Sequence, residues 1–196
     1  MRTEAVTLRL AVFPRSSLLT QAALVVAGTL LVAGAAQISF KLPFTPVPIT
    51  GQTFAVVLVG ASLGAVSGTA SLALYLLAGL VLPFYADGRH GVDVVYGASG
   101  GYIIGFVIAA GVTGFLAERR WDRRFSSSVG AMLTGNVIIY LVGLPWLAWK
   151  LNTNLDDMLK DGLYPFVPGD LFKLYIAAAA LPTAWRLVER VKGTGH

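Results

Sequence analysis

Long stretches without a charged side chain dominate this sequence. Between Ser16 and Ala86 the only Lys, Arg, Asp or Glu is Lys41. Three later stretches contain none: Val94–Ala117, Ser126–Trp149 and Leu174–Trp185. Charged residues make up 13% of the chain, about half of the ~25% that is usual in soluble domains. A membrane-crossing helix needs about 20 mainly apolar residues, and helices satisfy their own backbone hydrogen bonds in lipid. The alternating pattern of a transmembrane barrel does not occur. The sequence therefore predicts an all-α integral membrane protein.

Proline and glycine residues divide the apolar stretches into six predicted membrane helices. Pro43, Pro46 and Pro48 close the first helix, and the run Gly64–Gly68 suits a tight turn between two short ones. We expect one membrane domain, 1–196, with no second domain. Its predicted spans are 18–40, 53–63, 67–82, 101–117, 129–149 and 171–187. The first span is interpreted as a membrane helix and not as a cleaved signal peptide, because it lacks a small-residue cleavage site.

The positions of the charges favour a six-helix bundle with both termini in the cytoplasm. With six spans, ten of the 15 Lys and Arg residues lie on the side of the termini. They are Arg2, Arg9, Arg15, Arg119, Arg120, Arg123, Arg124, Arg186, Arg190 and Lys192. Cytoplasmic segments are enriched in Lys and Arg, whereas five or seven spans would divide this set between the two faces. The net charge of +5 thus reflects membrane topology and does not indicate nucleic-acid binding.

The sequence gives no support for a catalytic, metal or nucleotide site. It has no Cys, and His90 and His196 cannot form a metal centre by themselves. The segment Gly97–Tyr102 is glycine-rich, but no phosphate-binding loop pattern occurs. A membrane enzyme acting on a lipid would need paired acidic clusters, and Asp156-Asp157 has no second cluster. A channel would need a polar path through the inner halves of the helices. We therefore expect neither an enzyme nor a bound cofactor.

Polar residues in the outer halves of the predicted helices are the best candidates for a binding site. Asp170 and Lys173 lie one helical turn apart, and Asn136 and Tyr140 interrupt an apolar helix. Charges close to hydrocarbon are costly, which favours a functional assignment. The alternatives are an N-cap Asp with a snorkelling Lys, and an Asn that joins two helices. Arg89, in an outer loop, could clamp a carboxylate, although loop charges are usually only solvated.

Small residues recur at four-residue spacing, as in membrane helices that approach each other closely. Most of these pairs suit packing inside one bundle. Ala23 and Ala27, on the first helix, could instead belong to a docking surface for another membrane protein.

Five motifs follow one another along the chain. They are Pro46-Val-Pro-Ile-Thr-Gly-Gln-Thr53, Leu82-Pro-Phe-Tyr-Ala86, Gly100-Gly-Tyr-Ile-Ile-Gly-Phe106, Gly135-Asn136 with Tyr140, and Pro165-Phe-Val-Pro-Gly-Asp-Leu-Phe-Lys173. In this combination, from about Leu18 to Leu187, the chain resembles the BioY family. Its members are the biotin-specific substrate-binding (S) components of energy-coupling factor (ECF) transporters. One departure is Ala98-Ser99, where the family more often carries Pro-Thr.

The resemblance implies a six-helix protein of the prokaryotic cytoplasmic (inner) membrane that binds biotin near its outer face and takes it up. Biotin offers a ureido ring, an apolar bicycle and chain, and a terminal carboxylate. By this resemblance Asp170 accepts from the ureido N–H groups, Lys173 donates to the ureido carbonyl, and Asn136 does both. The implied carboxylate clamp is Arg89, or Gly100, Gly101 and Tyr102. The implied apolar wall is Phe84, Tyr85, Tyr102 and Tyr140.

The same resemblance implies protein partners. Ala23 and Ala27 match the AxxxA pattern through which S components dock on a transmembrane coupling subunit, which works with two cytosolic ATPases. Biotin is then a transported ligand and not a cofactor, and membrane lipid surrounds the chain. The sequence has no ATP-binding motif of its own. Another vitamin as ligand, or solitary uptake by a homo-oligomer, stays open as an alternative.

Overall fold

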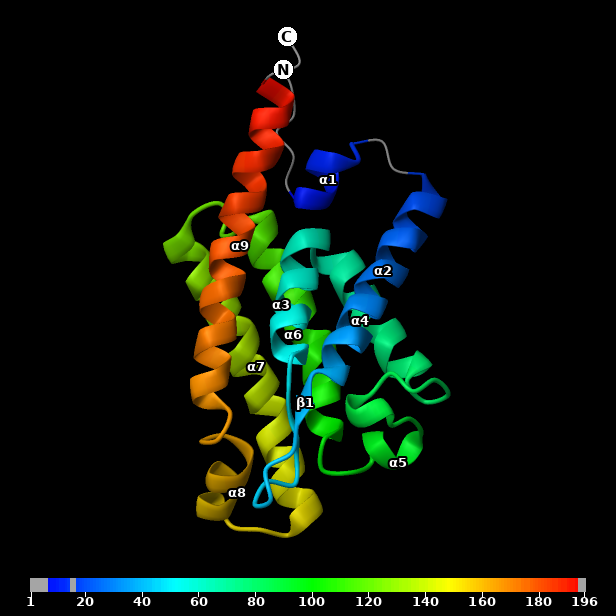
Figure 1. The fold of residues 1–196 in the computed structure, drawn as a ribbon, viewed down its shortest axis with the longest axis vertical. Helices are drawn as coiled ribbons and strands as arrows, with labels where there is room; N and C mark the ends of the chain where they lie inside the picture. Colours follow the sequence, from blue (N-terminus) through cyan, green and yellow to red (C-terminus); the bar gives the residue numbers. More distant parts are fainter. Residues whose placement is uncertain (1–6, 15–16, 194–196) are drawn as a thin grey trace.

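The computed structural model describes residues 7–14 and 17–193, which form an elongated bundle of helices (Figure 1). Within these residues, four helices are long and apolar enough to cross a membrane. They are α2 (Leu18–Gln37), α6 (Gly100–Glu118), α7 (Phe125–Leu151) and α9 (Val167–Gly193). Two further apolar helices are shorter, α3 (Gln52–Leu63) and α4 (Ala65–Ala78). The described chain is therefore mostly helical and has several helices suited to a bilayer, in agreement with the fold class expected from the sequence.

The helix ends differ from the predicted ones for local reasons. The helix expected at 18–40 stops at Gln37, because the chain continues as strand β1 (Ser39–Phe40). The helix expected at 67–82 ends at Ala78, and a Cβ on the following Gly79 would lie 2.3 Å from the ring of Tyr85. The helix expected at 129–149 begins at Phe125. The helix expected at 171–187 starts four residues earlier, with Pro168 in its first turn, where no N–H is needed.

The short helices α3 and α4 form a hairpin with a very tight turn. Gly64 alone separates them and has a φ of +86°, a left-handed conformation that favours glycine. The turn is therefore tighter than the predicted run Gly64–Gly68. The carboxylate of Glu118, at the end of α6, accepts a hydrogen bond from the Ala65 N–H at 2.8 Å. It thereby satisfies one of the N–H groups that the start of α4 leaves without a helical partner.

A small N-terminal helix lies against this turn. α1 (Leu8–Val12) contacts α3 and α9, and the Arg9 guanidinium donates to the Ser67 hydroxyl at 3.1 Å. With 12 residues at about 1.5 Å per residue, α3 is about 18 Å long, whereas the hydrocarbon layer is ~30 Å thick. Thus α1 covers the space that the short hairpin leaves at this end of the bundle.

Helix α6 occupies the centre of the bundle and α2 its edge. In the most apolar stretch of α6, 61% of the residues are buried, whereas in that of α2 only 22% are. Glycines allow the close approach: a Cβ on Gly60 would lie 2.3 Å from the Thr113 hydroxyl and 2.5 Å from the Ala110 carbonyl oxygen. The glycine spacing within α3 and α6 is therefore explained by packing inside the bundle.

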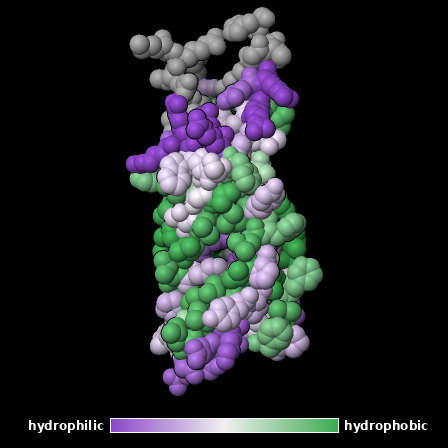
Figure 2. Space-filling model, turned by 90° about the vertical axis from the view of Figure 1, so that its left-hand side faces the viewer, coloured by the Kyte–Doolittle hydropathy of each residue, from purple (hydrophilic) through white to green (hydrophobic). Residues whose placement is uncertain are grey.

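The irregular segments gather at one end. Strand β1 pairs antiparallel with β2 (Ile49–Thr50), and η1 (Ala86–Gly88), α5 (Val92–Val95) and α8 (Leu155–Gly162) lie at the same end (Figure 1). We call this the hairpin end. The opposite end, with α1 and the turn 119–124, is called the basic end. Figure 2 shows a hydrophobic belt between two hydrophilic ends, as expected for a protein that spans a bilayer.

Candidate functional site

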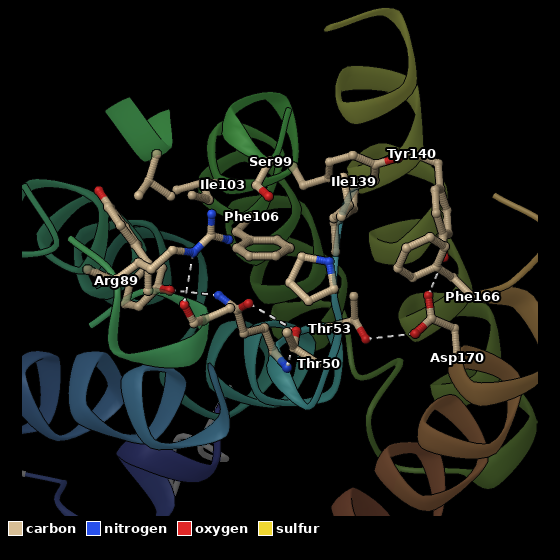
Figure 3. A pocket seen from close by; sticks show the side chains of 18 of the residues that line it. Thr50, Thr53, Arg89, Ser99, Ile103, Phe106, Ile139, Tyr140, Phe166 and Asp170 are labelled. Atoms are coloured by element: carbon tan, nitrogen blue, oxygen red, sulfur yellow. Dashed lines mark hydrogen bonds between the residues drawn. The ribbon is translucent and has the colours of Figure 1, made fainter. Parts of the chain in front are cut away.

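A pocket opens at the hairpin end and has a volume of about 570 Å³, measured out to its mouth (Figure 3). Its apolar lining includes Val47, Ile103, Phe106, Ile139 and Phe166. Its polar lining is Thr50, Gln52, Thr53, Tyr75, Tyr85, Arg89, Ser99, Tyr102, Tyr140, Asp170 and Lys173. The pocket thus combines a mainly apolar wall with a limited set of polar groups, as expected for a small-molecule site.

Asp170 is the centre of the polar set. The residue is 4% exposed, and its Oδ1 accepts hydrogen bonds from the Thr53 hydroxyl at 2.9 Å and from Lys173 Nζ at 3.0 Å. Its Oδ2 accepts a hydrogen bond from the Tyr140 hydroxyl. Helices α3, α7 and α9 therefore each supply a donor to one buried carboxylate. Such donors are required, because burying an unpaired carboxylate is very costly.

Lys173 links this carboxylate to the β hairpin. Its Nζ also donates to the Thr50 carbonyl oxygen at 2.6 Å, and its side chain is 20% exposed. Asp170 lies within the first turn of α9, where its N–H donates to the Phe166 carbonyl oxygen at 2.8 Å. The alternative of an N-cap Asp with a snorkelling Lys is therefore wrong: both side chains take part in one buried network.

A second set of hydrogen bonds connects α3, α4 and the loop before η1. Gln52 Nε2 donates to the Tyr75 hydroxyl at 2.7 Å, and the Tyr75 hydroxyl donates to the Phe84 carbonyl oxygen at 3.3 Å. The Tyr85 hydroxyl donates to the Leu76 carbonyl oxygen at 2.6 Å. Burial raises the pKa of Tyr85 to about 12, so this hydroxyl keeps its proton at neutral pH. These contacts hold the loop above the pocket in a fixed position.

Arg89 and Asp170 lie on opposite sides of the pocket, with the ring of Phe106 between them (Figure 3). Arg89 Nε donates to the Ala86 carbonyl oxygen at 3.3 Å, which leaves the terminal nitrogens of the guanidinium for other acceptors. The pocket therefore has a carboxylate with a lysine at one side and a guanidinium at the other.

The structure brings together six of the ten predicted ligand-binding residues: Asp170, Lys173, Tyr140, Arg89, Tyr85 and Tyr102. The other four, Asn136, Phe84, Gly100 and Gly101, do not line this pocket. A Cβ on Gly101 would lie 2.3 Å from the Trp146 side chain, so this glycine is needed where α6 packs on α7. Asn136 lies one turn from Tyr140, further from the hairpin end, and is 8% exposed. Its Oδ1 is buried and accepts no hydrogen bond from any described residue.

Several lining residues were not among those predicted, notably Gln52, Thr53 and Tyr75. A signal for the first two existed in the Pro46–Thr53 motif, whose polar end precedes an apolar helix. No local pattern distinguishes Tyr75 from the other aromatic residues of the apolar stretches. In the described part of the chain, no group of three or more His, Asp or Glu side chains could hold a metal ion.

Comparison with known proteins agrees with this architecture. The model of the BioY family matches residues 4–190, nearly the whole sequence. The chain belongs to the BioY family. A biotin transporter BioY of Thermotoga maritima is 38% identical over 142 residues, covering 70% of this chain and 80% of that protein. A probable biotin transporter BioY of Pyrococcus horikoshii is 38% identical over 153 residues, covering 78% and 86%.

A solved structure has a similar fold. The crystal structure of the S-component for biotin from an ECF-type ABC transporter superposes with a TM-score of 0.75 at 25% sequence identity. The match covers 86% of this chain and 92% of that one. The resemblance inferred from the sequence motifs is therefore confirmed, and the fold of this BioY-family chain is that of a membrane S-component.

Proposed function

We propose that this BioY-family chain captures biotin at its hairpin end and acts as the substrate-binding component of an ECF-type ABC transporter. The observation that carries the proposal is the buried Asp170 cluster at the wall of a mainly apolar pocket. Relatives that the chain matches over most of their length are named biotin transporters. The site residues named below are part of the proposal.

The chemistry of biotin fits the arrangement of the polar groups. Asp170 is an acceptor suited to the ureido N–H groups, and Lys173 is a donor suited to the ureido carbonyl. When the ring binds, its N–H groups would replace Thr53 and Tyr140, which donate to the same carboxylate in the structure. The carboxylate is already held in a desolvated site, so little ordering is needed when biotin binds.

The rest of the ligand would extend across the pocket towards Arg89. The apolar bicycle and valeryl chain would contact Phe106, Ile103 and Phe166, all of which line the pocket. The terminal carboxylate would then meet the guanidinium of Arg89, which is able to bind it through two parallel hydrogen bonds. Arg89 is therefore the proposed carboxylate clamp, in preference to Gly100 and Gly101, which pack against Trp146.

We further propose six membrane-crossing segments with both termini on the cytoplasmic side of a prokaryotic cytoplasmic membrane. The basic end carries Arg119, Arg120, Arg123, Arg124 and Arg186, and cytoplasmic segments are enriched in such residues. Helices α3 and α4 would be the second and third segments, and α1 covers one end of their short hairpin. The biotin pocket then faces the outside.

The face of α2 suits a protein partner, for which we propose the transmembrane coupling subunit with its two ATPases. Ala23 and Ala27 are both exposed, unlike the glycines of α3 and α6, so packing inside the bundle does not explain them. The same face continues at Leu30 and Gly34, which border an apolar groove between α2, α3 and α9. Small residues let a partner helix approach closely.

The first experiment is calorimetric titration of the detergent-purified chain with biotin. We expect saturable binding of about one biotin per chain. A folded, monodisperse sample that binds no biotin would overturn the proposal, and other vitamins would then be titrated in the same way.

A separate experiment tests the partner surface: Ala23→Trp should prevent co-purification with the coupling subunit and leave biotin affinity unchanged. Unaltered co-purification would assign the face of α2 to lipid or to a second copy of the chain.

A further inference from the structure

A second hollow lies at the basic end, far from the biotin pocket. It is formed between the turn 119–124 and α9 and has a volume of about 900 Å³, measured out to its open mouth. Four arginines line it: Arg120, Arg123, Arg124 and Arg186. Glu189 is the only acidic residue among the described residues that line it, so the lining carries an excess of positive charge. Nothing in the proposed capture of biotin uses these groups.

The floor of the hollow is rigid. The Asp122 carboxylate is fully buried and accepts a hydrogen bond from the Trp185 indole N–H. The guanidinium of Arg123 lies over the Trp185 ring, 3.3 Å from its centroid, and its Nη1 is 3.5 Å from Glu189. Cation–π stacking and the ion pair therefore fix this arginine against α9.

Two arginines at the rim are differently placed. Arg124 and Arg186 are both exposed, and neither side chain has a hydrogen bond or an ion pair with another described residue. They come from different elements, the start of α7 and the last third of α9, and face one hollow. Guanidinium groups are the side chains best suited to bind phosphate through paired hydrogen bonds.

The surroundings point to a lipid phosphate. Figure 2 views the side of the bundle with α9 and shows hydrophilic residues directly above the hydrophobic belt. At this end Trp121, in the turn 119–124, is 41% exposed. Exposed aromatic residues of this kind mark the level of lipid headgroups. A phospholipid whose phosphate lies in the hollow would thus have its acyl chains beside an apolar helix surface.

We propose that this hollow binds the phosphodiester headgroup of an anionic phospholipid, with Arg124 and Arg186 as its two exchangeable donors and the stacked Arg123 as its floor. The site would hold one lipid at the junction of α7 and α9, on the opposite side of the membrane from the biotin pocket. Basic pockets between membrane helices are known to select anionic headgroups in this manner.

The test is native mass spectrometry of the full chain in neutral detergent, with phosphatidylglycerol, with phosphatidylcholine of the same acyl chains, and with inorganic phosphate. We expect one phosphatidylglycerol to bind at least about tenfold more tightly than phosphatidylcholine. Arg124→Gln and Arg186→Gln should each weaken it about fivefold, which corresponds to the usual contribution of one basic residue near an anionic headgroup. Competition by millimolar inorganic phosphate would support phosphate recognition at this site.

Arg119→Gln is the matched control. Arg119 is exposed at the same end, but it lies over the Phe115 ring and does not line the hollow. It should change lipid affinity less than twofold. Equal affinity for both lipids, an equal effect of Arg119→Gln, or binding of inorganic phosphate without phosphatidylglycerol would each overturn the proposal. Circular dichroism melting of every variant checks the fold. We expect the fold to be intact because both rim side chains are exposed.

Discussion

Two buried aspartates lie at opposite ends of the bundle, Asp170 in the first turn of α9 and Asp122 against Trp185 of the same helix, and they differ in their hydrogen-bond partners. Asp170 is 4% exposed and Asp122 is 0% exposed. Asp170 accepts hydrogen bonds from three side chains on three helices, including the ammonium group of Lys173. Asp122 accepts one from Trp185, and its Oδ1 has no hydrogen bond from another described residue, with Arg123 Nε 3.9 Å away.

This difference agrees with the proposal that Asp170 binds the ligand and Asp122 stabilises the fold. The donors to Asp170 border an open pocket, so a ligand can replace some of them without leaving the carboxylate unpaired. Around Asp122 the space is filled by Trp185 and Arg123. Burial raises the pKa of the Asp122 carboxyl, against the opposing effects of the Trp185 N–H and of Arg123. The number of exchangeable donors beside empty space, and not burial alone, supports Asp170 as the proposed binding residue.

Replacing each aspartate by asparagine is the strongest test of this comparison. Asp170→Asn removes the charge that two ureido N–H groups would meet. Hydrogen bonds to a charged group contribute about 1.5–3 kcal/mol each, so we expect biotin affinity to fall at least about a hundredfold. Asp122→Asn should change it less than about twofold. Calorimetric titration measures both, and similar losses in the two variants would remove the distinction.

Lys173→Met tests the second half of the Asp170 pair. The change removes the donor to the ureido carbonyl and the bond to the Thr50 carbonyl oxygen, which holds the hairpin. We expect biotin affinity to fall about tenfold to a hundredfold, because one hydrogen bond to a charged group contributes about 1.5–3 kcal/mol. Backbone amides near Ile49 should also exchange hydrogen faster.

Lys150→Met is the matched control for Lys173→Met. Lys150 is at the same end and partly buried, with its Nζ 4.4 Å from the centroid of the Trp149 ring. It does not line the pocket, so biotin affinity should stay within about twofold of the unmodified protein. A comparable loss there would mean that any positive charge at the hairpin end assists binding.

The part of this site that the sequence could predict is the part carried by local spacing. Asp170 and Lys173 are one turn apart in an apolar stretch, so their proximity followed from helical geometry. Asn136 and Tyr140, four residues apart, are also about one turn from each other, yet only Tyr140 lines the pocket. Phe106 and Ile139 line the pocket from different helices, and no spacing within one helix contains that information.

Contacts between distant segments were beyond prediction for a related reason. Lipid-facing and core-facing surfaces are both apolar here, so hydrophobic periodicity does not show which face of a helix is buried. The bond between Gln52 and Tyr75 joins two helices through such a face. Gly100 and Gly101 have the composition of a ligand-binding loop, but the side chain of Trp146 next to them makes them packing residues.

Trp185→Phe tests the structural function of Asp122. The ring is kept for Arg123, whereas the N–H donor is lost and the buried carboxylate has no replacement. Leaving a buried acceptor unsatisfied costs about 1–3 kcal/mol, so we expect the Tm to fall by roughly 3–8 °C. Biotin affinity should be unchanged. A loss of affinity without a change in Tm would connect the basic end to the biotin pocket.

The smallest expected effect concerns an exposed ion pair beside the pocket. Lys41 and Asp87 are 2.7 Å apart, with side chains 66% and 26% exposed, and they join the hairpin to η1 near the mouth. Exposed pairs contribute less than about 1 kcal/mol. Asp87→Asn should therefore raise the dissociation rate of biotin only about twofold to threefold, measured by displacement of labelled biotin. High salt should abolish the difference from the unmodified protein, because it screens exposed charges.

The pH dependence of this pair has a definite sign. The hydrogen bond from Lys41 lowers the pKa of the Asp87 carboxyl below its usual value near ~3.9. Because the pKa of this carboxyl is lowered in the folded state, the stabilisation from the ion pair is complete above the usual, unfolded-state pKa. It is lost as the pH falls through the folded-state pKa. The biotin dissociation rates of the unmodified protein and of Asp87→Asn should therefore differ by a constant factor from pH 7 to pH 5. The two rates should converge only below about pH 4. Convergence of the two rates already near pH 6 would show that a group other than Asp87 controls the mouth of the pocket. The exposed Asp87 pair responds to salt and pH in this way because, unlike the buried Asp170, it is not shielded from solvent.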